Sequence, residues 1–465
     1  MKDNSIAYDK KLTTPEAVAA LVTDGMWIDY GCIQSPRAFD RALANRGAEL
    51  TDVKIRMLVT MNYPEVMKRD AADGAFWIGN WHVLGKTRQL LQENRAHYIP
   101  LHFGEGPRYY REDRPVDMAI QTVTPMDSHG FFNFGPNIAL TRSLMEKARI
   151  RVVEVNESVP WVYGGYDECI HISEVDYVIE NNRDPIVEVP APALTETDRN
   201  IAERIAEYIP LDGPCLQIGI GSLPNQLLKM LGRMGAKDIG IHTEMLTEAM
   251  QELADAGLIT GRKKTLLPGK IVHTFALGNR KLYDWMDRNP AIAGYPADFT
   301  NDPYVIAMNR DFISINSALA VDLQGQVSAE SIGWKHYSGT GGQPAFVRGA
   351  YYRSSRGQAP MGYSGSKSFI AFHSTYSDND GTLQSRIVPV LSPGEIVTTP
   401  RSDVSYIATE YGVVYLKGLS VPERVIALTG IAHPDFRDML LEEAEKMGWV
   451  SKRWFMTGPG QDYSY

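Results

Sequence analysis

Apolar runs of strand length alternate with helix-like segments along most of the chain. Residues 54–61, 116–123, 149–156 and 175–180 are rich in β-branched side chains, and turn or helical signals bound each run. Such runs favour buried strands, and their alternation with helices favours a mostly parallel sheet built from βα units. The pattern therefore predicts an α/β fold.

A proline-containing connector divides this pattern near the middle of the chain. Three prolines between positions 185 and 192 disfavour helix and favour an extended segment. We therefore place a domain boundary near 186–196 and expect two domains, residues 1–190 and 191–465.

The second half opens with a strand, a glycine turn and a helix that we expect to start near Pro224. The turn reads "IGIGSLP" from Ile218 to Pro224. Its glycines allow backbone N–H groups to approach a phosphate or an oxyanion, although an ordinary tight turn has the same composition. A dinucleotide fingerprint would need a third glycine where Pro224 stands, which disfavours that interpretation.

A carboxylate follows the next apolar run, "DIGIHTEML" at 238–246. Glu244 lies where the predicted strand ends, and open α/β sheets bind ligands at the carboxyl ends of their strands. A carboxylate there can act as a base, a metal ligand or a nucleophile, or simply begin a helix. His242 lies two residues earlier on the same strand face and could border a pocket.

Two later loops are also rich in small residues. "YSGTGGQPAF" at 337–346 has three glycines within four residues, which permits close backbone approach or simple flexibility. "GYSGSKSFIAF" at 362–372 contains Lys367, which could meet a phosphate or be a solvated lysine. The P-loop spacing is absent from this second loop.

Composition narrows the function classes. The 465 residues carry a net charge of −9, which argues against a nucleic-acid-binding surface. Cys32, Cys169 and Cys215 are far apart and form neither a zinc motif nor a disulfide framework. Because the chain also lacks a signal-peptide core and a membrane-length apolar run, we expect a cytoplasmic protein without a metal centre.

Taken in order, these motifs resemble family I coenzyme A transferases of the acetyl-CoA hydrolase/transferase branch. The second half carries "QIGIGSLPN", "GIHTEM", "TNDPYVIA", "SINSALAVDLQGQV" and "YSGTGGQ", and the first half carries "WIDYG", "PRYYRE", "MDSHGFFNFGPN" and "HISEVD". The resemblance covers residues 10–448 and is close to butyryl-CoA:acetate and 4-hydroxybutyrate CoA-transferases. It implies two open, mostly parallel α/β domains of similar fold with the active site between them.

The resemblance also implies roles for individual residues. Glu244 would be the nucleophile, Asn301 in "FTNDP" would orient it, and the N–H groups of Ile220 and Gly342 would form an oxyanion hole. Contacts with coenzyme A are expected at Gly219, Ile220, Gly221, Ser222, Leu223, Leu319, Ser338, Gly342 and Lys367.

The implied activity is transfer of CoA from a short-chain acyl-CoA, such as butyryl-CoA, to an acid such as acetate. Catalysis would be ping-pong through an acyl-glutamyl anhydride and a glutamyl-CoA thioester, with CoA as substrate and no prosthetic group. A hydrolase using the same glutamate is the alternative, and an NAD-dependent dehydrogenase or a non-catalytic CoA-binding protein is a more distant one. Relatives are commonly dimers or tetramers, so we expect a homo-oligomer that binds neither nucleic acid nor membrane.

Two details of the resemblance concern the shape of the site. Pro344 and Ala345 stand where relatives commonly carry an apolar residue and an aspartate. For the acyl pocket, the sequence offers apolar and aromatic candidates in the first domain, although core packing is the more common role for any one of them: Met26, Tyr30, Met61, Tyr109 and Tyr110.

Overall fold

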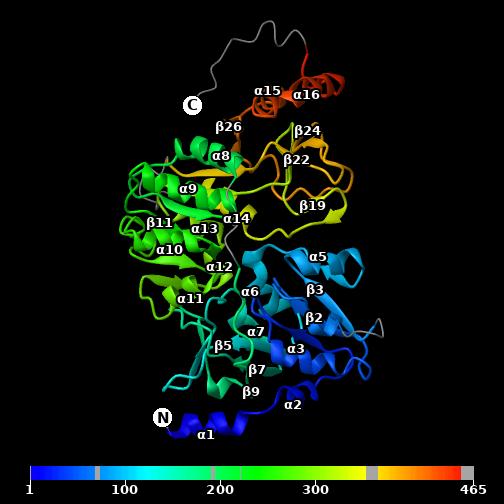
Figure 1. Ribbon diagram of the computed structural model, residues 1–465, viewed down its shortest axis with the longest axis vertical. Coiled ribbons are helices and arrows are strands. Elements are labelled where there is room, and N and C mark those ends of the chain that lie inside the picture. Colours follow the sequence, from blue (N-terminus) through cyan, green and yellow to red (C-terminus); the bar gives the residue numbers. More distant parts are fainter. Residues whose placement is uncertain are drawn as a thin grey trace.

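The computed structural model describes residues 2–68, 74–189, 193, 195–219, 221–351 and 365–451. These residues form two α/β lobes stacked along the long axis of the molecule, with the N-terminus at one end and the last described helix at the other (Figure 1). The predicted α/β class is confirmed.

The first lobe contains a fully parallel sheet of seven strands among the described residues. Its order is β4 (Ala96–Tyr98), β3 (Phe76–Asn80), β2 (Val53–Met57), β1 (Trp27–Asp29), β5 (Met118–Val123), β7 (Ile150–Val155) and β9 (Tyr177–Glu180). The chain builds outward from β1 to β4, then returns to add β5, β7 and β9 on the other side. The four apolar runs predicted as strands correspond to β2, β5, β7 and β9.

The second lobe repeats this path with a larger sheet. Its order is β15 (Ile292–Gly294), β13 (Ile271–His273), β11 (Gly240–His242), β10 (Cys215–Ile218), β16 (Phe312–Asn316), β21 (Lys367–Ala371), β25 (Tyr406–Thr409) and β26 (Gly412–Tyr415). Only the pairing of β25 with the edge strand β26 is antiparallel among the described pairs of this sheet. The two lobes therefore share one topology, and in each the carboxyl ends of the parallel strands meet at one edge.

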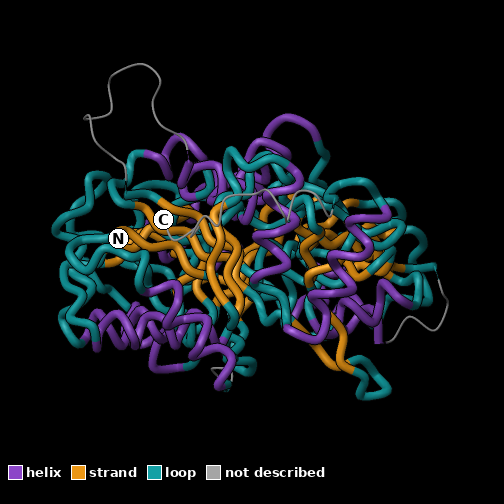
Figure 2. Tube along the Cα trace, turned by 90° about the horizontal axis from the view of Figure 1, so that it is seen from above, coloured by secondary structure: helices purple, strands orange, loops and turns teal. Residues whose placement is uncertain are grey.

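Both sheets are buried on two faces, which explains why their strands are continuous apolar runs. In β5, Met118 and Ile120 pack in one hydrophobic cluster while Ala119 packs in another on the opposite face. In β16, Ile313 faces one cluster and Phe312 faces another. Helices cover the faces of both sheets (Figure 2).

The helices of the first lobe are α1 (Lys2–Lys11), α2 (Pro15–Ala19), α3 (Arg37–Ala44), α4 (Glu65–Lys68), α5 (Gly85–Gln92), α6 (Gly106–Arg108) and α7 (Thr141–Lys147). Those of the second lobe are α8 (Glu196–Ala206), α9 (Ser222–Arg233), α10 (Glu248–Asp255), α11 (Arg280–Met286), α12 (Ala297–Thr300), α13 (Pro303–Ala307), α14 (Gln343–Tyr351), α15 (Val421–Gly430) and α16 (Pro434–Lys446). Helix α9 begins two residues before the predicted start at Pro224, because proline is tolerated within a first turn. No helix in the described ranges has the length and apolar character needed to cross a bilayer.

Short strands decorate the two lobes. They are β6 (Phe131–Asn133), β8 (Cys169–His171), β12 (Met245–Leu246), β14 (Phe275–Ala276), β17 (Ala320–Asp322), β18 (Val327–Ser328), β19 (Ser331–Ile332), β20 (Lys335–His336), β22 (Thr375–Ser377), β23 (Leu383–Ser385) and β24 (Ile387–Val388). The first large sheet ends at Glu180 and the second begins at Cys215, and the predicted connector at 186–196 lies between them. Part of that connector is outside the described residues, and the boundary within it stays a prediction.

Candidate active site

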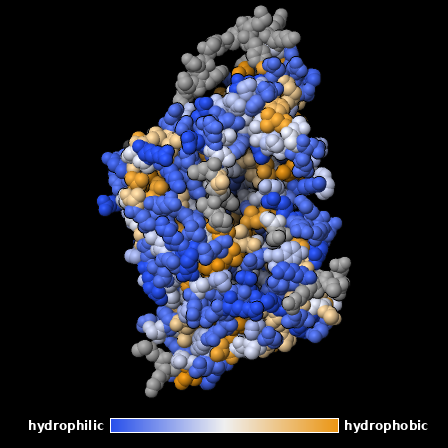
Figure 3. Space-filling view, viewed as in Figure 1, coloured by the Kyte–Doolittle hydropathy of each residue, from blue (hydrophilic) through white to orange (hydrophobic). Residues whose placement is uncertain are grey.

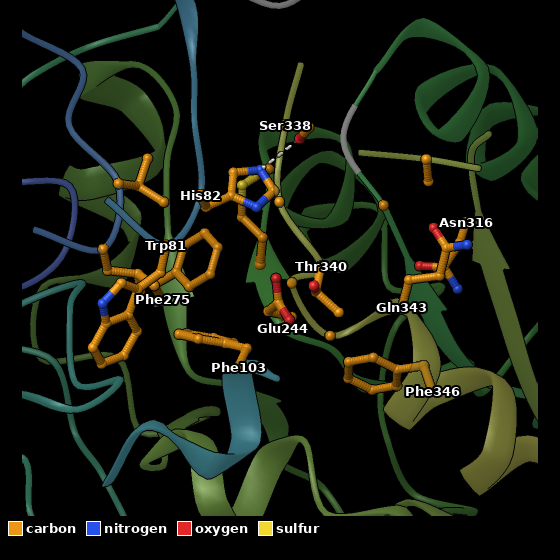
Figure 4. Close-up of a pocket in the computed structure, with 18 of the residues that line it drawn as sticks. Trp81, His82, Phe103, Glu244, Phe275, Asn316, Ser338, Thr340, Gln343 and Phe346 are labelled. Carbon is orange, nitrogen blue, oxygen red and sulfur yellow. Dashed lines mark hydrogen bonds between the residues drawn. The ribbon is translucent and has the colours of Figure 1, made fainter. Parts of the chain in front are cut away.

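A pocket of about 220 Å³ lies between the carboxyl edges of the two sheets (Figure 4). The first lobe lines it with apolar residues that follow β1 to β4, namely Ile33, Leu58, Val59, Trp81, Leu101 and Phe103. The second lobe contributes residues that follow β10, β11 and β16, together with the loop 338–343. Apolar residues also gather on the surface where the lobes meet (Figure 3). Carboxyl edges of parallel sheets are the usual place for ligands, so this pocket is the candidate active site.

Glu244 lies at the centre of this pocket because two neighbouring strands are interrupted at the same level. β11 ends at His242 and the chain resumes as β12 at Met245, which pairs with β14. In the gap, the Glu244 carbonyl oxygen accepts hydrogen bonds from the N–H groups of Thr274 and Phe275, both at 3.1 Å. The backbone is therefore held at this point, and the side chain projects into the pocket.

Two groups hold the Glu244 carboxylate. The Asn301 amide nitrogen donates to Oε2 at 2.6 Å, and the Gly342 backbone N–H donates to the carboxylate. Asn301 follows helix α12, and its own N–H donates to the Ala297 carbonyl, which fixes its position. Asn301 thus binds one carboxylate oxygen, and the other oxygen, Oε1, faces the pocket.

Burial makes Glu244 unusually basic. Desolvation raises its pKa from 4.5 to about 7, while the hydrogen bonds from Asn301 and Gly342 oppose that rise. The side chain keeps a partly exposed face on the pocket. A carboxylate that is poorly solvated but held in one orientation is suited to nucleophilic attack near neutral pH.

The loop from Ser338 to Gly342 fits tightly between the lobes. A Cβ on Gly339 would lie 2.4 Å from the Trp81 carbonyl oxygen, and a Cβ on Gly342 would lie 2.0 Å from Glu244 Oε2. The Gly341 carbonyl accepts from the Phe103 N–H of the first lobe at 3.2 Å. Glycine is therefore required at 339 and 342 for space.

A buried carboxylate anchors the same loop. Glu330 Oε2 accepts from the hydroxyls of Tyr98 and Thr340, each at 3.0 Å, and the Tyr98 hydroxyl in turn accepts from the Thr340 N–H at 3.1 Å. Because Tyr98 comes from β4 of the first lobe, this network links both lobes two residues from Gly342. It fixes the amide that contacts Glu244.

Helix α14 begins directly after Gly342. The Gly342 carbonyl accepts from the Phe346 N–H at 3.1 Å, so Gly342 stands at the helix N-terminus, which favours negative charge. Pro344 lies in the first turn, where its missing N–H would have no partner within the helix. The departure from the family pattern at this position therefore leaves the loop intact.

The opposite wall of the pocket is polar. The Ser314 hydroxyl donates to Gln217 Oε1 at 2.7 Å, and the Asn316 amide donates to Ser314 Oγ at 2.9 Å. Gln217 and Asn316 both line the pocket. These amides can bind the amide groups of an extended ligand, while the first lobe offers an apolar surface.

Comparisons with known proteins agree with this architecture. Residues 1–190 match the acetyl-CoA hydrolase/transferase N-terminal domain, and residues 278–444 match the corresponding C-terminal domain. A butyryl-CoA:acetate CoA-transferase from Anaerostipes caccae is 43% identical over 443 residues, which is 94% of this chain and 97% of the relative. The chain belongs to the acetyl-CoA hydrolase/transferase family.

Other members of this family are nearly as similar. The 4-hydroxybutyrate coenzyme A transferase of Clostridium kluyveri is 38% identical over 445 residues, covering 94% of this chain and 98% of that protein. A crystal structure of RipA from Yersinia pestis has a TM-score of 0.85 and 35% identity, and the match covers 96% of this chain and all of that chain. The protein is accordingly a CoA-transferase by family.

The structure brings together several residues that the sequence singled out. Gly219, Ser338 and Gly342 line the pocket with Glu244, and Asn301 contacts Glu244 directly. Ile220 lies outside the described residues, so its role as an oxyanion donor stays a prediction. Gly221 is the N-cap of α9, Leu223 is buried in the core of the second lobe, and Ser222 begins that helix.

Two expected CoA contacts do not lie on the pocket wall. Lys367 starts β21 opposite Ile313, at the amino edge of the sheet and away from Glu244, and its Nζ donates to the Gly365 carbonyl. The structure does not bring it to this site. Leu319 lies just beyond the pocket-lining Ser317, and its N–H donates to the Ser328 carbonyl.

The aromatic candidates for the acyl pocket were wrong. Tyr110 donates to Asp29 in a buried cluster, Tyr30 donates to Asp40, and Tyr109 packs edge-to-face against Trp81 and is absent from the pocket lining. The other two, Met26 and Met61, are likewise absent from the lining.

His242 is structural. It is fully buried, its Nε2 is bonded to the Thr300 carbonyl at 2.9 Å, and burial lowers its pKa to about 3.

Sequence reasoning missed the contribution of the first lobe, above all Trp81, His82 and Phe103. A usable signal existed for His82. It follows the apolar run "FWIGN" as Glu244 follows its own strand, at the carboxyl end where ligands bind.

Proposed function

We propose that this protein transfers CoA between a short-chain acyl-CoA, with butyryl-CoA as the expected donor, and a carboxylic acid such as acetate. The observation that carries the proposal is the Glu244 carboxylate, held by Asn301 and Gly342 in a pocket shared by both lobes. The relatives named as butyryl-CoA:acetate and 4-hydroxybutyrate transferases support this choice of substrates.

The reaction begins with attack of Glu244 Oε1 on the thioester carbonyl carbon. The carbon–sulfur bond breaks, CoA leaves as a thiolate, and an acyl-glutamyl anhydride forms. The thiolate then attacks the Glu244 carbonyl carbon, which releases the carboxylate and leaves a glutamyl-CoA thioester. Acetate then attacks the glutamyl-CoA thioester, and the two steps run in reverse until acetyl-CoA leaves and Glu244 is free again. These steps need no metal ion or redox group.

Each step passes through a tetrahedral oxyanion. The Gly342 N–H, which lies at the N-terminus of α14 and contacts Glu244, would be one donor to this oxyanion, and the Ile220 N–H is the predicted second donor. One such donor contributes roughly 3 kcal/mol to transition-state stabilisation. Asn301 would keep the glutamate in the attacking rotamer through both half-reactions.

The pocket lining suits an acyl-CoA substrate. Ile33, Leu58 and Phe103 offer an apolar surface for the acyl group, while Gln217 and Asn316 offer hydrogen bonds to the pantetheine amides.

The discriminating experiment compares product formation with and without acetate. A transferase converts butyryl-CoA to acetyl-CoA only when acetate is present, releases little free CoA, and gives parallel lines in double-reciprocal plots. A hydrolase releases free CoA at the same rate without acetate, and that result would reject the proposal. Free thiol and chromatographic separation of the two acyl-CoA species provide the two readouts.

A further inference from the structure

His82 occupies a defined place on the pocket wall opposite Glu244 (Figure 4). It follows β3 of the first lobe, and its N–H donates to the Leu58 carbonyl at 3.0 Å. Gly339 packs directly on it, since a Cβ there would lie 2.9 Å from His82 Cα. These contacts therefore hold the backbone of His82 in place.

The His82 ring is neutral and has one free nitrogen. Burial, with a smaller effect of Arg88, lowers its pKa to about 4. Nε2 lies 3.1 Å from the Ser338 hydroxyl oxygen, whereas Nδ1 has no hydrogen-bond partner among the described residues. A neutral imidazole has one donor and one acceptor nitrogen. With Ser338 as the donor to Nε2, the proton lies on Nδ1, which is the tautomer that the inference below requires.

Nδ1 and the reactive oxygen of Glu244 border the same space. The point where a Cβ on Gly341 would stand is 3.7 Å from His82 Nδ1 and 3.9 Å from Glu244 Oε1. Gly341 adopts a φ of 54° and places no side chain between these two atoms. Both atoms therefore border the same part of the pocket beside Gly341, and a substrate carboxylate between them would contact the histidine on one side and the glutamate on the other.

We propose that His82 binds the substrate acid, with Nδ1–H donating to the carboxylate oxygen that does not form the anhydride. This inference rests on the proposed function and adds a residue to it. The first-lobe wall is otherwise apolar at Ile33, Leu58 and Phe103, and a buried carboxylate oxygen without a donor is costly.

A neutral donor suits both half-reactions. It binds the departing carboxylate and the entering carboxylate alike, because both occupy the same place relative to Glu244. It does not form an ion pair with Glu244, as a lysine or arginine there would, and so leaves the nucleophile free.

The test separates binding of acids from binding of CoA. His82→Phe removes the donor, and His82→Asn keeps an amide N–H near the position of Nδ1. For His82→Phe we expect the KM for acetate and the inhibition constant for butyrate to rise together by about 10- to 100-fold, as for loss of a hydrogen bond to a charged group. The dissociation constant of free CoA stays at the wild-type value, and His82→Asn recovers most of the loss. His97→Phe is the matched control, because His97 is exposed on β4 and absent from the pocket lining.

Two outcomes would overturn the inference. Unchanged acetate KM and butyrate inhibition in His82→Phe would show that the ring does not bind the acid. An equal weakening of CoA binding would show that His82 only supports the glycine loop. In ¹⁵N-histidine spectra of the wild-type enzyme, the His82 signal is the one missing from the His82→Phe spectrum. The inference predicts a protonated Nδ1 whose signal shifts on addition of acetate; an unprotonated or unshifted Nδ1 contradicts it. If butyryl-CoA leaves no adduct on wild-type Glu244, the proposed function itself fails. If the adduct forms but one of the two overturning results is found, only the role of His82 is rejected.

Discussion

Replacing Gly342 with alanine tests the contact between the glycine loop and the nucleophile. The added Cβ would lie 2.0 Å from Glu244 Oε2 and 2.1 Å from Asn301 Nδ2. Gly342 does not have a positive φ, so alanine can adopt its backbone conformation and the perturbation is one of contact alone.

The size of the effect follows from these distances. Cβ atoms essentially never approach other atoms within 3.0 Å, so the carboxylate or the loop must move by about 1 Å. A misplacement of about 1 Å at reacting groups costs on the order of 10²-fold in rate. Displacing the amide donor as well brings the expected loss in kcat to about 10²- to 10³-fold.

The assay measures initial rates of acetyl-CoA formation at saturating butyryl-CoA and acetate. The matched control is Gly430→Ala at the end of α15, where a Cβ would meet no atom within 4 Å. We expect the control to match the wild type in kcat and unfolding temperature, and Gly342→Ala to stay folded with an unfolding temperature lowered by overpacking of about 1–3 kcal/mol. A Gly342→Ala enzyme with wild-type kcat would refute the reasoning, because the nucleophile would not need the observed contact.

Three further predictions concern Glu244 and its partner. The logarithm of kcat/KM for the acyl-CoA should rise with unit slope as pH increases toward about 7, because only the ionised Glu244 attacks; a profile that is flat through this range contradicts the raised pKa. Asn301→Ala should lower kcat and move the midpoint of that profile to higher pH, since Asn301 opposes the effect of burial; an unmoved midpoint argues against their coupling. Glu244→Gln should abolish exchange and increase the free energy of unfolding above pH 7 by at most about 3 kcal/mol, measured with denaturant. The native carboxyl holds its proton between pH 4.5 and 7, so wild-type stability falls as pH rises through that window, and an equal gain below pH 4.5 would contradict this explanation.

Much of the fold was predictable because parallel strands buried on both faces give uninterrupted apolar runs. β5 and β7 coincide with such runs almost residue for residue. The position of Glu244 followed from the same logic, since the residue after a parallel strand lies at the ligand-binding edge. Lys367 shows the complementary case: it is the first residue of β21 and therefore lies at the amino edge of the sheet, opposite the ligand-binding edge.

The first-lobe wall of the pocket was not predictable from local pattern. Trp81 and Phe103 meet the loop 338–342 only because the two carboxyl edges face each other, and no spacing along the chain encodes that arrangement. The aromatic residues Tyr30 and Tyr110 looked equally suitable for an acyl pocket, yet their hydroxyls find buried carboxylates at Asp40 and Asp29 instead. Such choices depend on long-range packing.

The central claim is that Glu244 carries both the acyl group and CoA during turnover. Borohydride treatment of the enzyme after mixing with butyryl-CoA, followed by peptide mass spectrometry, tests it most directly, since borohydride reduces a glutamyl thioester to an alcohol. The account predicts a reduced side chain at Glu244, loss of activity in proportion, and protection when acetate is added first to discharge the thioester. Full inactivation with the modification on another residue, or an unmodified Glu244 in an enzyme that still exchanges CoA, would contradict it.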